Sequence, residues 1–425
     1  MSEQEFIKKA ENSGIDQIQI TRITTEEDQV QYINEKREKY EVSNITSYLI
    51  KAEKDKKTVK MKGEYLDESI INTILMKLQY IESKNEDSYL ENTEDNNQKK
   101  IKKTFDMGVI FPKIEKAIKE KKKSNITKIE INYVKRYKEI QIINNNGVNR
   151  NTSTDNYILV IEVVAHKDDK DAVARKTINQ KDYDFDFEKI LDEEIKEAQY
   201  RLEEKILKTG KYRVLIQNKV AGRLLSSIMA GLNANEIQKK NSIFQDKLNQ
   251  NIATPLLNII EDPTDIEYPG YALFDMEGTK TKRKEVIKDG ILKTYFYNNK
   301  TAQKDNVVST ANEYGGINTS NLYIIPGEKN QEELIKELSN GVVVTNFMCG
   351  GDSISIEKGN ISLQIFGYLV EDGKIKCGIK PAILTTTFDE VLNKLQGVGN
   401  DLLFSMPQVG SPSLLFDNLS IASDK

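Results

Sequence analysis

The stretch FGYLVEDGKIKCG, from Phe366 to Gly378, predicts two strands joined by a tight turn at Asp372-Gly373. An Asp-Gly pair between β-type runs favours a two-residue hairpin because both positions tolerate a positive φ. A second stretch of this kind, EVIKDGILKTYFY from Glu285 to Tyr297, turns at Asp289-Gly290. The two hairpins predict that the second half of the chain is built mainly of antiparallel strands.

The segments around these hairpins add more strands and a few short helices. Strands are expected at 322–325 and 342–347, and helices at 331–338 and 388–395. Further back, an amphipathic pattern predicts one long helix over 185–209, with Gly210 placed to terminate it. We place a domain boundary there, between an N-terminal domain of residues 1–205 and a C-terminal β-rich domain of residues 206–425.

The first half of the chain mixes helical and strand patterns. Helices are expected at 2–10, 66–82 and 112–122, and strands at 18–23, 42–52, 58–62, 126–134, 137–143 and 157–165. Asp67 is the expected N-cap of the second helix, and Asn145-Asn146-Gly147 is a tight-turn signal. The polar stretch 83–104 is expected to be a loop or an insertion. The predicted fold class is therefore α+β, with a mixed α/β N-terminal domain followed by antiparallel hairpins and short helices.

The composition does not favour nucleic acid or a membrane as a partner. The 62 basic and 66 acidic residues give a net charge of -4. The longest apolar stretch, 158–165, is far shorter than the roughly 20 residues of a spanning helix. The N-terminus has no apolar segment typical of a signal peptide, and Cys349 and Cys377 lie far apart, so a cytoplasmic location is expected.

Residues for the common catalytic chemistries are few. His166 is the single histidine, and it precedes the charged run Lys167-Asp168-Asp169-Lys170, which favours a surface turn over a catalytic base. The stretch 261–265 and the pair Asp275 and Glu277 supply carboxylates for an all-oxygen metal site, although their Pro and Gly neighbours favour turns. No phosphate-binding glycine motif is present, and no cofactor is expected. Taken alone, these residues favour a binding or regulatory subunit over an enzyme.

The order of short motifs in the second half resembles the TldD/PmbA family, whose members are known as gyrase-modulator or microcin-maturation proteins. The motifs that carry the resemblance are, in chain order, 209–214 (TGKYRV), 221–225 (AGRLL), 261–263 (EDP), 270–279 (GYALFDMEGT), 289–292 (DGIL), 301–302, 321–322, 326–327, 367–368, 371–375 (EDGKI), 397–401 (GVGND) and 411–421. The resemblance covers residues 200–425 well and the first 200 residues loosely.

The resemblance implies a choice between two branches of the family. In the TldD branch, an HExxxH helix and a cysteine near the C-terminus bind the catalytic metal. The corresponding positions here are Ser226, Ser227 and Gly231, and no cysteine lies between Asp401 and Ser411. Serine hydroxyls are poor zinc ligands and glycine offers none. The chain therefore resembles the PmbA/TldE branch, the non-catalytic partner of a TldD-type metalloprotease.

The resemblance also implies partners. A TldD-like catalytic subunit in a heterodimer is expected, or a homodimer, together with unfolded peptides bound by strand addition. The strands near 342–347 and 361–368 are the expected peptide sites, and the candidate residues are Val344, Asn346, Phe347, Gly350 and Gly351. Two alternatives stay open: a regulatory protein that binds a gyrase- or antitoxin-like partner, and a peptidase with a non-histidine site.

Overall fold

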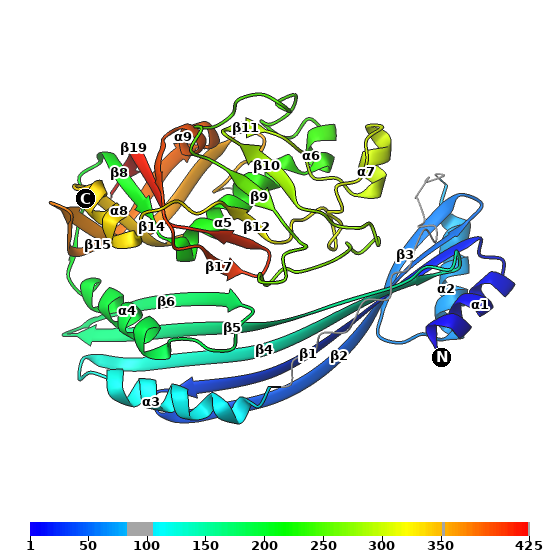
Figure 1. Ribbon diagram of the computed structural model, residues 1–425, viewed down its shortest axis with the longest axis horizontal. Coiled ribbons are helices and arrows are strands. Elements are labelled where there is room, and N and C mark those ends of the chain that lie inside the picture. The colour runs from blue at the N-terminus through cyan, green and yellow to red at the C-terminus, as the bar shows by residue number, and fades with distance from the viewer. Residues whose placement is uncertain (83–104, 351–352, 424–425) are drawn as a thin grey trace.

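The computed structural model describes residues 1–82, 105–350 and 353–423 of the chain (Figure 1). The expected loop at 83–104 and the candidate Gly351 lie outside these residues. The described residues combine one long sheet in the first half with two sheets in the second half, and helices pack on them. The predicted α+β class is confirmed.

The first half is built on a six-stranded antiparallel sheet with the order β3-β2-β1-β4-β5-β6. Its strands are β1 (Gln17–Ile33), β2 (Lys36–Lys54), β3 (Lys57–Gly63), β4 (Ile126–Asn144), β5 (Asn149–Lys167) and β6 (Lys170–Gln180). A strand rises about 3.3 Å per residue, so a 19-residue strand such as β4 is roughly 60 Å long. The sheet forms the elongated layer along the lower part of Figure 1.

Helices cover this sheet at its two ends (Figure 1). Helices α1 (Glu3–Asn12) and α2 (Glu68–Tyr80) cover one end, and η1 (Met107–Val109), α3 (Phe111–Lys121) and α4 (Phe187–Tyr200) cover the other. The odd-numbered residues Ile131 and Tyr133 of β4 and Leu159 and Ile161 of β5 pack in the core with α3 and α4. Because side chains alternate along a strand, the even-numbered residues of β4 and β5 face the second half of the chain.

The prediction of two separate strands at 126–134 and 137–143 was wrong, because β4 is one strand. The polar pair Lys135 and Arg136 interrupts the apolar pattern in the sequence. In the structure, both residues pair with β1 and β5 on their two sides, and Arg136 lies opposite Glu27 and Asn156. Hydrogen bonding to strands on both sides therefore keeps the backbone extended at these two polar residues, where the local sequence pattern predicts that the strand ends.

The second half contains two sheets. The first has the order β11-β10-β9-β12-β18-β17, and its strands are β9 (Ile259–Glu261), β10 (Lys284–Lys288), β11 (Ile291–Leu292), β12 (Leu322–Ile324), β17 (Leu403–Met406) and β18 (Val409–Ser411). The second has the order β16-β19-β8-β13-β14-β15-β7, and its strands are β7 (Glu204–Lys205), β8 (Gly210–Ile216), β13 (Gly341–Met348), β14 (Asn360–Glu371), β15 (Lys374–Thr387), β16 (Leu395–Val398) and β19 (Leu414–Ala422).

Helices of this half lie around and between these sheets (Figure 1). They are α5 (Asn218–Met229), η2 (Ala230–Leu232), α6 (Ala234–Gln238), α7 (Asn299–Lys304), α8 (Gln331–Leu338) and α9 (Phe388–Asn393). Leu224 and Ile228 of α5 belong to one large apolar core with residues of both sheets, such as Ile259 and Val344. Helix α5 is therefore held in the middle of the second half.

Several local predictions are confirmed. The Asp67 carboxylate caps α2 by accepting from the Ile70 amide, and α8 spans the predicted residues. Both hairpin turns have a positive φ at each central residue, 48° and 77° at Asp289-Gly290 and 50° and 67° at Asp372-Gly373. These values are those of the type I′ turn that the Asp-Gly pairs predict.

The predicted helix over 185–209 is too long. Helix α4 ends at Tyr200 with Arg201 as its C-cap, and Gly210 starts β8 instead of terminating the helix. After the helix, Glu204 and Lys205 pair in parallel with Gly378 and Ile379 of β15. Tertiary strand pairing therefore overrides the helical pattern of this segment. The domain boundary at 205/206 stays a prediction.

Within the described ranges, no helix is both long and apolar enough to cross a membrane.

Candidate functional site

Helix α5 carries the positions that the sequence assigns to a degenerate metal site. Ser226 and Ser227 are half-buried, and the Ser227 hydroxyl donates to the Arg223 carbonyl oxygen at 3.0 Å, one turn back on the same helix. Gly231 lies beyond the helix, in η2, where it is buried. Neither serine offers the imidazole or thiolate that holds zinc in most protein sites.

Gly231 is also sterically fixed. A Cβ atom added there would lie 2.9 Å from Cδ2 of Phe244, which is buried, and 3.2 Å from the Ser242 hydroxyl. The Ser242 hydroxyl in turn donates to the Gly231 carbonyl oxygen at 2.6 Å. A histidine cannot be placed at this position without moving the aromatic core, so the residues around α5 do not fit the metal of an HExxxH site.

The predicted peptide site lies beside α5. Along β13, residues Gly341–Val344 pair with β8 on one side, and β14 pairs on the other. Beyond Val344 the pairing with β8 ends, and Arg223 of α5 takes its place. Its Nη1 donates to the Phe347 carbonyl oxygen at 3.3 Å, and its guanidinium lies 4.4 Å from the centre of the Phe347 ring.

The four peptide candidates that the structure describes differ in how accessible they are. The side chains of Val344 and Phe347 are buried in the core, whereas Asn346 is half-buried and Gly350 is exposed. Only the last part of β13 has an edge that β8 leaves uncovered, so any added strand would pair there. The assignment of these residues to a peptide stays a prediction.

The carboxylates of the expected all-oxygen site lie in structural contacts. Glu261 is fully buried, and it pairs with Lys284 at 2.8 Å and accepts from the Asn312 amide. Burial raises its pKa, while the Lys284 charge acts in the opposite direction. Asp275 accepts from the backbone amides of Glu277, Thr279 and Glu313, an Asx-type arrangement that shapes its loop.

His166 is exposed, and its Nδ1 lies 2.8 Å from Asp171 Oδ1 across the β5–β6 turn. In the part of the chain that the structure describes, no three His, Cys, Asp or Glu residues are grouped closely enough to hold a metal ion.

A buried charge cluster, which the sequence reasoning missed, joins α4 to α5. Lys219 Nζ lies 3.0 Å from Glu194 Oε2 and 2.5 Å from Glu197 Oε2, and all three side chains are at most 6% exposed. Burial raises the pKa of Glu194 to about 7; the Lys219 charge acts against this increase, and the Glu197 charge adds to it. Glu194 and Glu197 are three residues apart and so lie on the same face of α4; this spacing could have suggested that they share one basic side chain.

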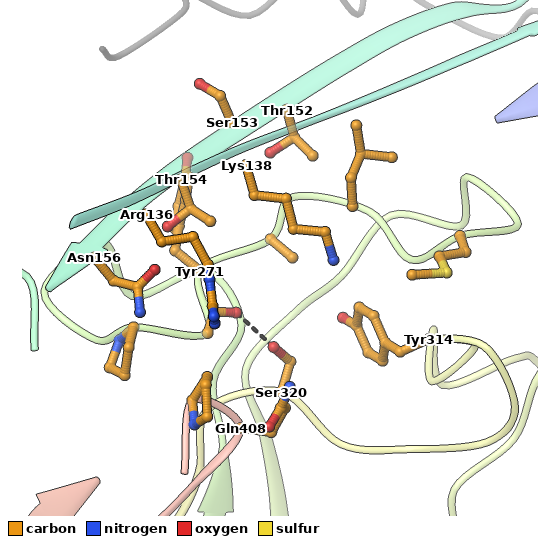
Figure 2. A pocket seen from close by; sticks show the side chains of 16 residues that line it. Arg136, Lys138, Thr152, Ser153, Thr154, Asn156, Tyr271, Tyr314, Ser320 and Gln408 are labelled. Carbon is orange, nitrogen blue, oxygen red and sulfur yellow. Dashed lines mark hydrogen bonds between the residues drawn. The ribbon is translucent and has the colours of Figure 1, made fainter. Parts of the chain in front are cut away.

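A cavity of about 180 Å³ was missed as well (Figure 2). It lies between the even-numbered face of β4 and β5 and the loops of the second half. Figure 2 shows Arg136 and Lys138 extending from β4 toward the loop that carries Tyr314 and Ser320. The signal for it was the even-numbered face of 136–142, which carries Arg136 and Lys138 followed by Ile140 and Ile142; this shared face goes unnoticed when the strand is broken at residue 135.

Two family models match the chain. Residues 209–423 match the PmbA/TldA metallopeptidase C-terminal domain, and residues 94–209 match the PmbA/TldA metallopeptidase central domain. Among curated relatives, the metalloprotease PmbA homolog of Buchnera aphidicola subsp. Baizongia pistaciae is 28% identical over 237 residues, which are 55% of this chain and 51% of the relative. Metalloprotease PmbA of Escherichia coli O157:H7 is 30% identical over 202 residues, which are 48% of this chain and 44% of the relative. The chain thus spans about half the length of these relatives.

Solved structures match over nearly the whole chain. A Thermotoga maritima protein named as a modulator of a DNA gyrase superposes with a TM-score of 0.88 at 26% identity, covering 99% of both chains. TldE from Thermococcus kodakarensis superposes with a TM-score of 0.87 at 18% identity, again over 99% of both chains. At 18% identity, the similarity to TldE shows that the two proteins share a fold.

Proposed function

This chain belongs to the PmbA/TldD family of metallopeptidase-related proteins, and we propose that it is a non-catalytic subunit that pairs with a TldD-like metallopeptidase chain. In this proposal the partner chain cuts unfolded peptides, and this chain helps to admit and hold them. The cytoplasmic location expected from the sequence is part of the proposal.

The observation that carries this proposal is the replacement of metal ligands on and after α5. Ser226, Ser227 and Gly231 stand where the TldD branch has His, Glu and His, and the packing of Phe244 leaves no room for a side chain at 231. A metallopeptidase needs both the metal and the base that this motif supplies. Peptide cleavage would therefore have to come from another chain.

The edge of β13 beyond Val344 supports a role in holding peptides. An extended peptide that replaces Arg223 at the Phe347 carbonyl oxygen could pair with this edge through its main chain, which gives affinity without strong sequence preference. Asn346 and Gly350 lie at or just after this edge, and neither is buried. Such a mode suits substrates whose main chain is free, as in unfolded peptides.

Co-expression with a TldD-like chain that carries HExxxH tests the proposal. We expect the two chains to co-purify and the complex to cleave an unfolded peptide mixture, whereas this chain alone binds no stoichiometric zinc and cleaves nothing. As a control, a partner whose motif glutamate is changed to glutamine should still form the complex but lose cleavage.

Two outcomes would contradict the proposal. Cleavage by the isolated chain in the presence of EDTA would show a peptidase with a site of its own. Binding to folded gyrase, together with failure to bind any TldD-like chain, would show a regulatory protein instead.

A further inference from the structure

The cavity of Figure 2 has a floor formed by three cross-strand pairs of the long sheet. In the β4–β5 register, Arg136 lies opposite Asn156, Lys138 opposite Thr154, and Ile140 opposite Thr152. Side chains of directly opposite residues lie on the same face, so the two basic groups share one surface with two hydroxyls and an amide.

Loops of the second half form the roof of this cavity, and buried hydrogen bonds fix their positions. The Ser320 amide donates to Glu261 Oε1 at 2.8 Å, and the Ser320 hydroxyl donates to the Gly270 carbonyl oxygen. The Asn321 side chain accepts from the Gly270 amide at 2.6 Å and donates to the Asp262 carbonyl oxygen at 3.1 Å. The cavity is thus a preformed feature on both sides.

The charge in the cavity is positive. Arg136 uses its Nε to contact Glu27 on β1 at 2.5 Å, which fixes the guanidinium. Lys138 has no ion pair with any residue in the described ranges, and the residues that line the cavity include no acid. Burial, together with the nearby Arg136 charge, lowers the pKa of Lys138, as expected for an ammonium group without a counter-charge.

Buried polar groups in the cavity also lack partners. Within the described part of the chain, Thr152 Oγ1 and Asn156 Nδ2 have no hydrogen-bond partner, although the two residues are only 5% and 4% exposed. Leaving such groups unsatisfied is costly, and native proteins rarely do so without a ligand or ordered water. The Tyr314 hydroxyl, whose pKa burial raises well above its usual value, stays protonated and is available beside them as a donor.

We propose that this cavity binds a compact oxyanion, a carboxylate or a phosphate, between Lys138 and the polar groups of Thr152, Asn156 and Tyr314. An ammonium, an amide and hydroxyl groups can all donate to such an anion. The apolar Ile140, Pro269 and Met276 at the same cavity would accommodate a short aliphatic portion next to it. The inference is independent of whether the chain is a catalytic or a non-catalytic subunit.

Three probes distinguish the sources of the oxyanion: acetyl-trialanine with a free C-terminal carboxylate, the same peptide as its C-terminal amide, and inorganic phosphate. Calorimetric titration of the full-length protein should show binding of the free acid or of phosphate, and no binding of the amide. Preference for the free acid identifies a peptide carboxylate as the source, and preference for phosphate identifies free phosphate. Binding of the amide as tightly as the acid, or of none of the probes, would overturn the inference.

Substitutions place the binding in this cavity. Lys138→Met should weaken binding of the preferred probe at least about tenfold, because a charge-assisted hydrogen bond is lost. Lys128→Met removes the same charge from the same strand, at an ion pair with Glu130 outside the cavity, and should leave affinity unchanged. Equal effects of the two variants would contradict the assignment.

Thr152→Val gives a second test that does not depend on a charge. Removing a buried hydroxyl without a partner should keep or raise the melting temperature of the free protein, yet weaken oxyanion binding by about two- to tenfold. A purely structural threonine would not produce this opposite pair of changes. Unchanged affinity in both Thr152→Val and Lys138→Met would show that the probe binds elsewhere.

Discussion

Three single residues determine that α5 and the turn after it cannot bind a catalytic metal ion. The sequence alone identified Ser226, Ser227 and Gly231, because a hydroxyl or a bare backbone stands where a metal ligand or a catalytic carboxylate would be needed. The contact of Gly231 with Phe244 could not be read in the same way, because Phe244 is 13 residues further along the chain and meets η2 only through the fold.

Gly231→Ala should destabilise the protein by about 1–3 kcal/mol, because the added Cβ would lie 2.9 Å from the buried Phe244 ring. Urea unfolding followed by circular dichroism measures this change. Gly350→Ala is the matched control, since a Cβ there meets only the Ser353 hydroxyl at 3.7 Å. Equal stabilities of the two variants would mean that the Phe244 ring moves aside freely.

Asp275 should make stability depend on pH. Burial, followed by the Glu277 charge, raises its pKa from 3.8 to about 7, so the folded state holds a proton that the unfolded state has released. Its contribution to stability is therefore complete below about pH 4 and is lost as the pH rises to about 7. The slope is at most about 1.4 kcal/mol per pH unit.

The variant Asp275→Asn isolates this effect because the amide does not titrate. The unfolding free energy of Asp275→Asn, minus that of the wild type, should rise between about pH 4 and pH 7 and stay constant above. The loss of one accepted backbone hydrogen bond adds only an offset that is the same at every pH. A difference that is flat across this range would contradict the raised pKa.

At the scale of elements, the sequence predicted those whose boundaries depend on local chemistry. Asp-Gly hairpin turns are set by residues within the turn, and in α2 and α8 a nearby side chain accepts the hydrogen bond of a backbone amide at the N-terminus of the helix. The C-terminal end of α4 and the continuity of β4 depend on pairing with strands far away in sequence. The cavity was missed for the same reason, since its floor exists only when β4 runs unbroken beside β5.

The contact between α4 and α5 depends on Lys219. Lys219→Met should cost about 3–5 kcal/mol of unfolding free energy, because two buried carboxylates lose their only described cationic contact at close range. Adding Glu194→Gln and Glu197→Gln should recover most of this loss, since no buried charge then remains unpaired. Both values come from urea unfolding.

The control for this cluster is Lys239→Met, which breaks an exposed ion pair with Glu236 and should cost less than about 1 kcal/mol. If Lys219→Met costs no more than this control, the buried cluster is not what holds the two helices together.

At the scale of the whole molecule, the two halves meet along the inner face of the long sheet. Ile140 and Ile142 of β4 pack against Phe274, and Arg150 of β5 donates to the Gly278 carbonyl oxygen. The Asn179 amide reaches the Phe404 carbonyl oxygen at 3.4 Å from β6. A loop region that packs on the sheet at several points is held at a fixed distance from it, which explains how a defined cavity persists between them.

The order of strands in the long sheet has a consequence for the chain during its synthesis. Strand β1 ends at Ile33, and its second neighbour, β4, begins at Ile126. A ribosome that adds roughly 5–20 residues per second needs about 5–20 s to produce the intervening segment. For that time the nascent β1–β2–β3 meander has an open edge of 17 residues, so a chaperone that shields strand edges would find its earliest target there.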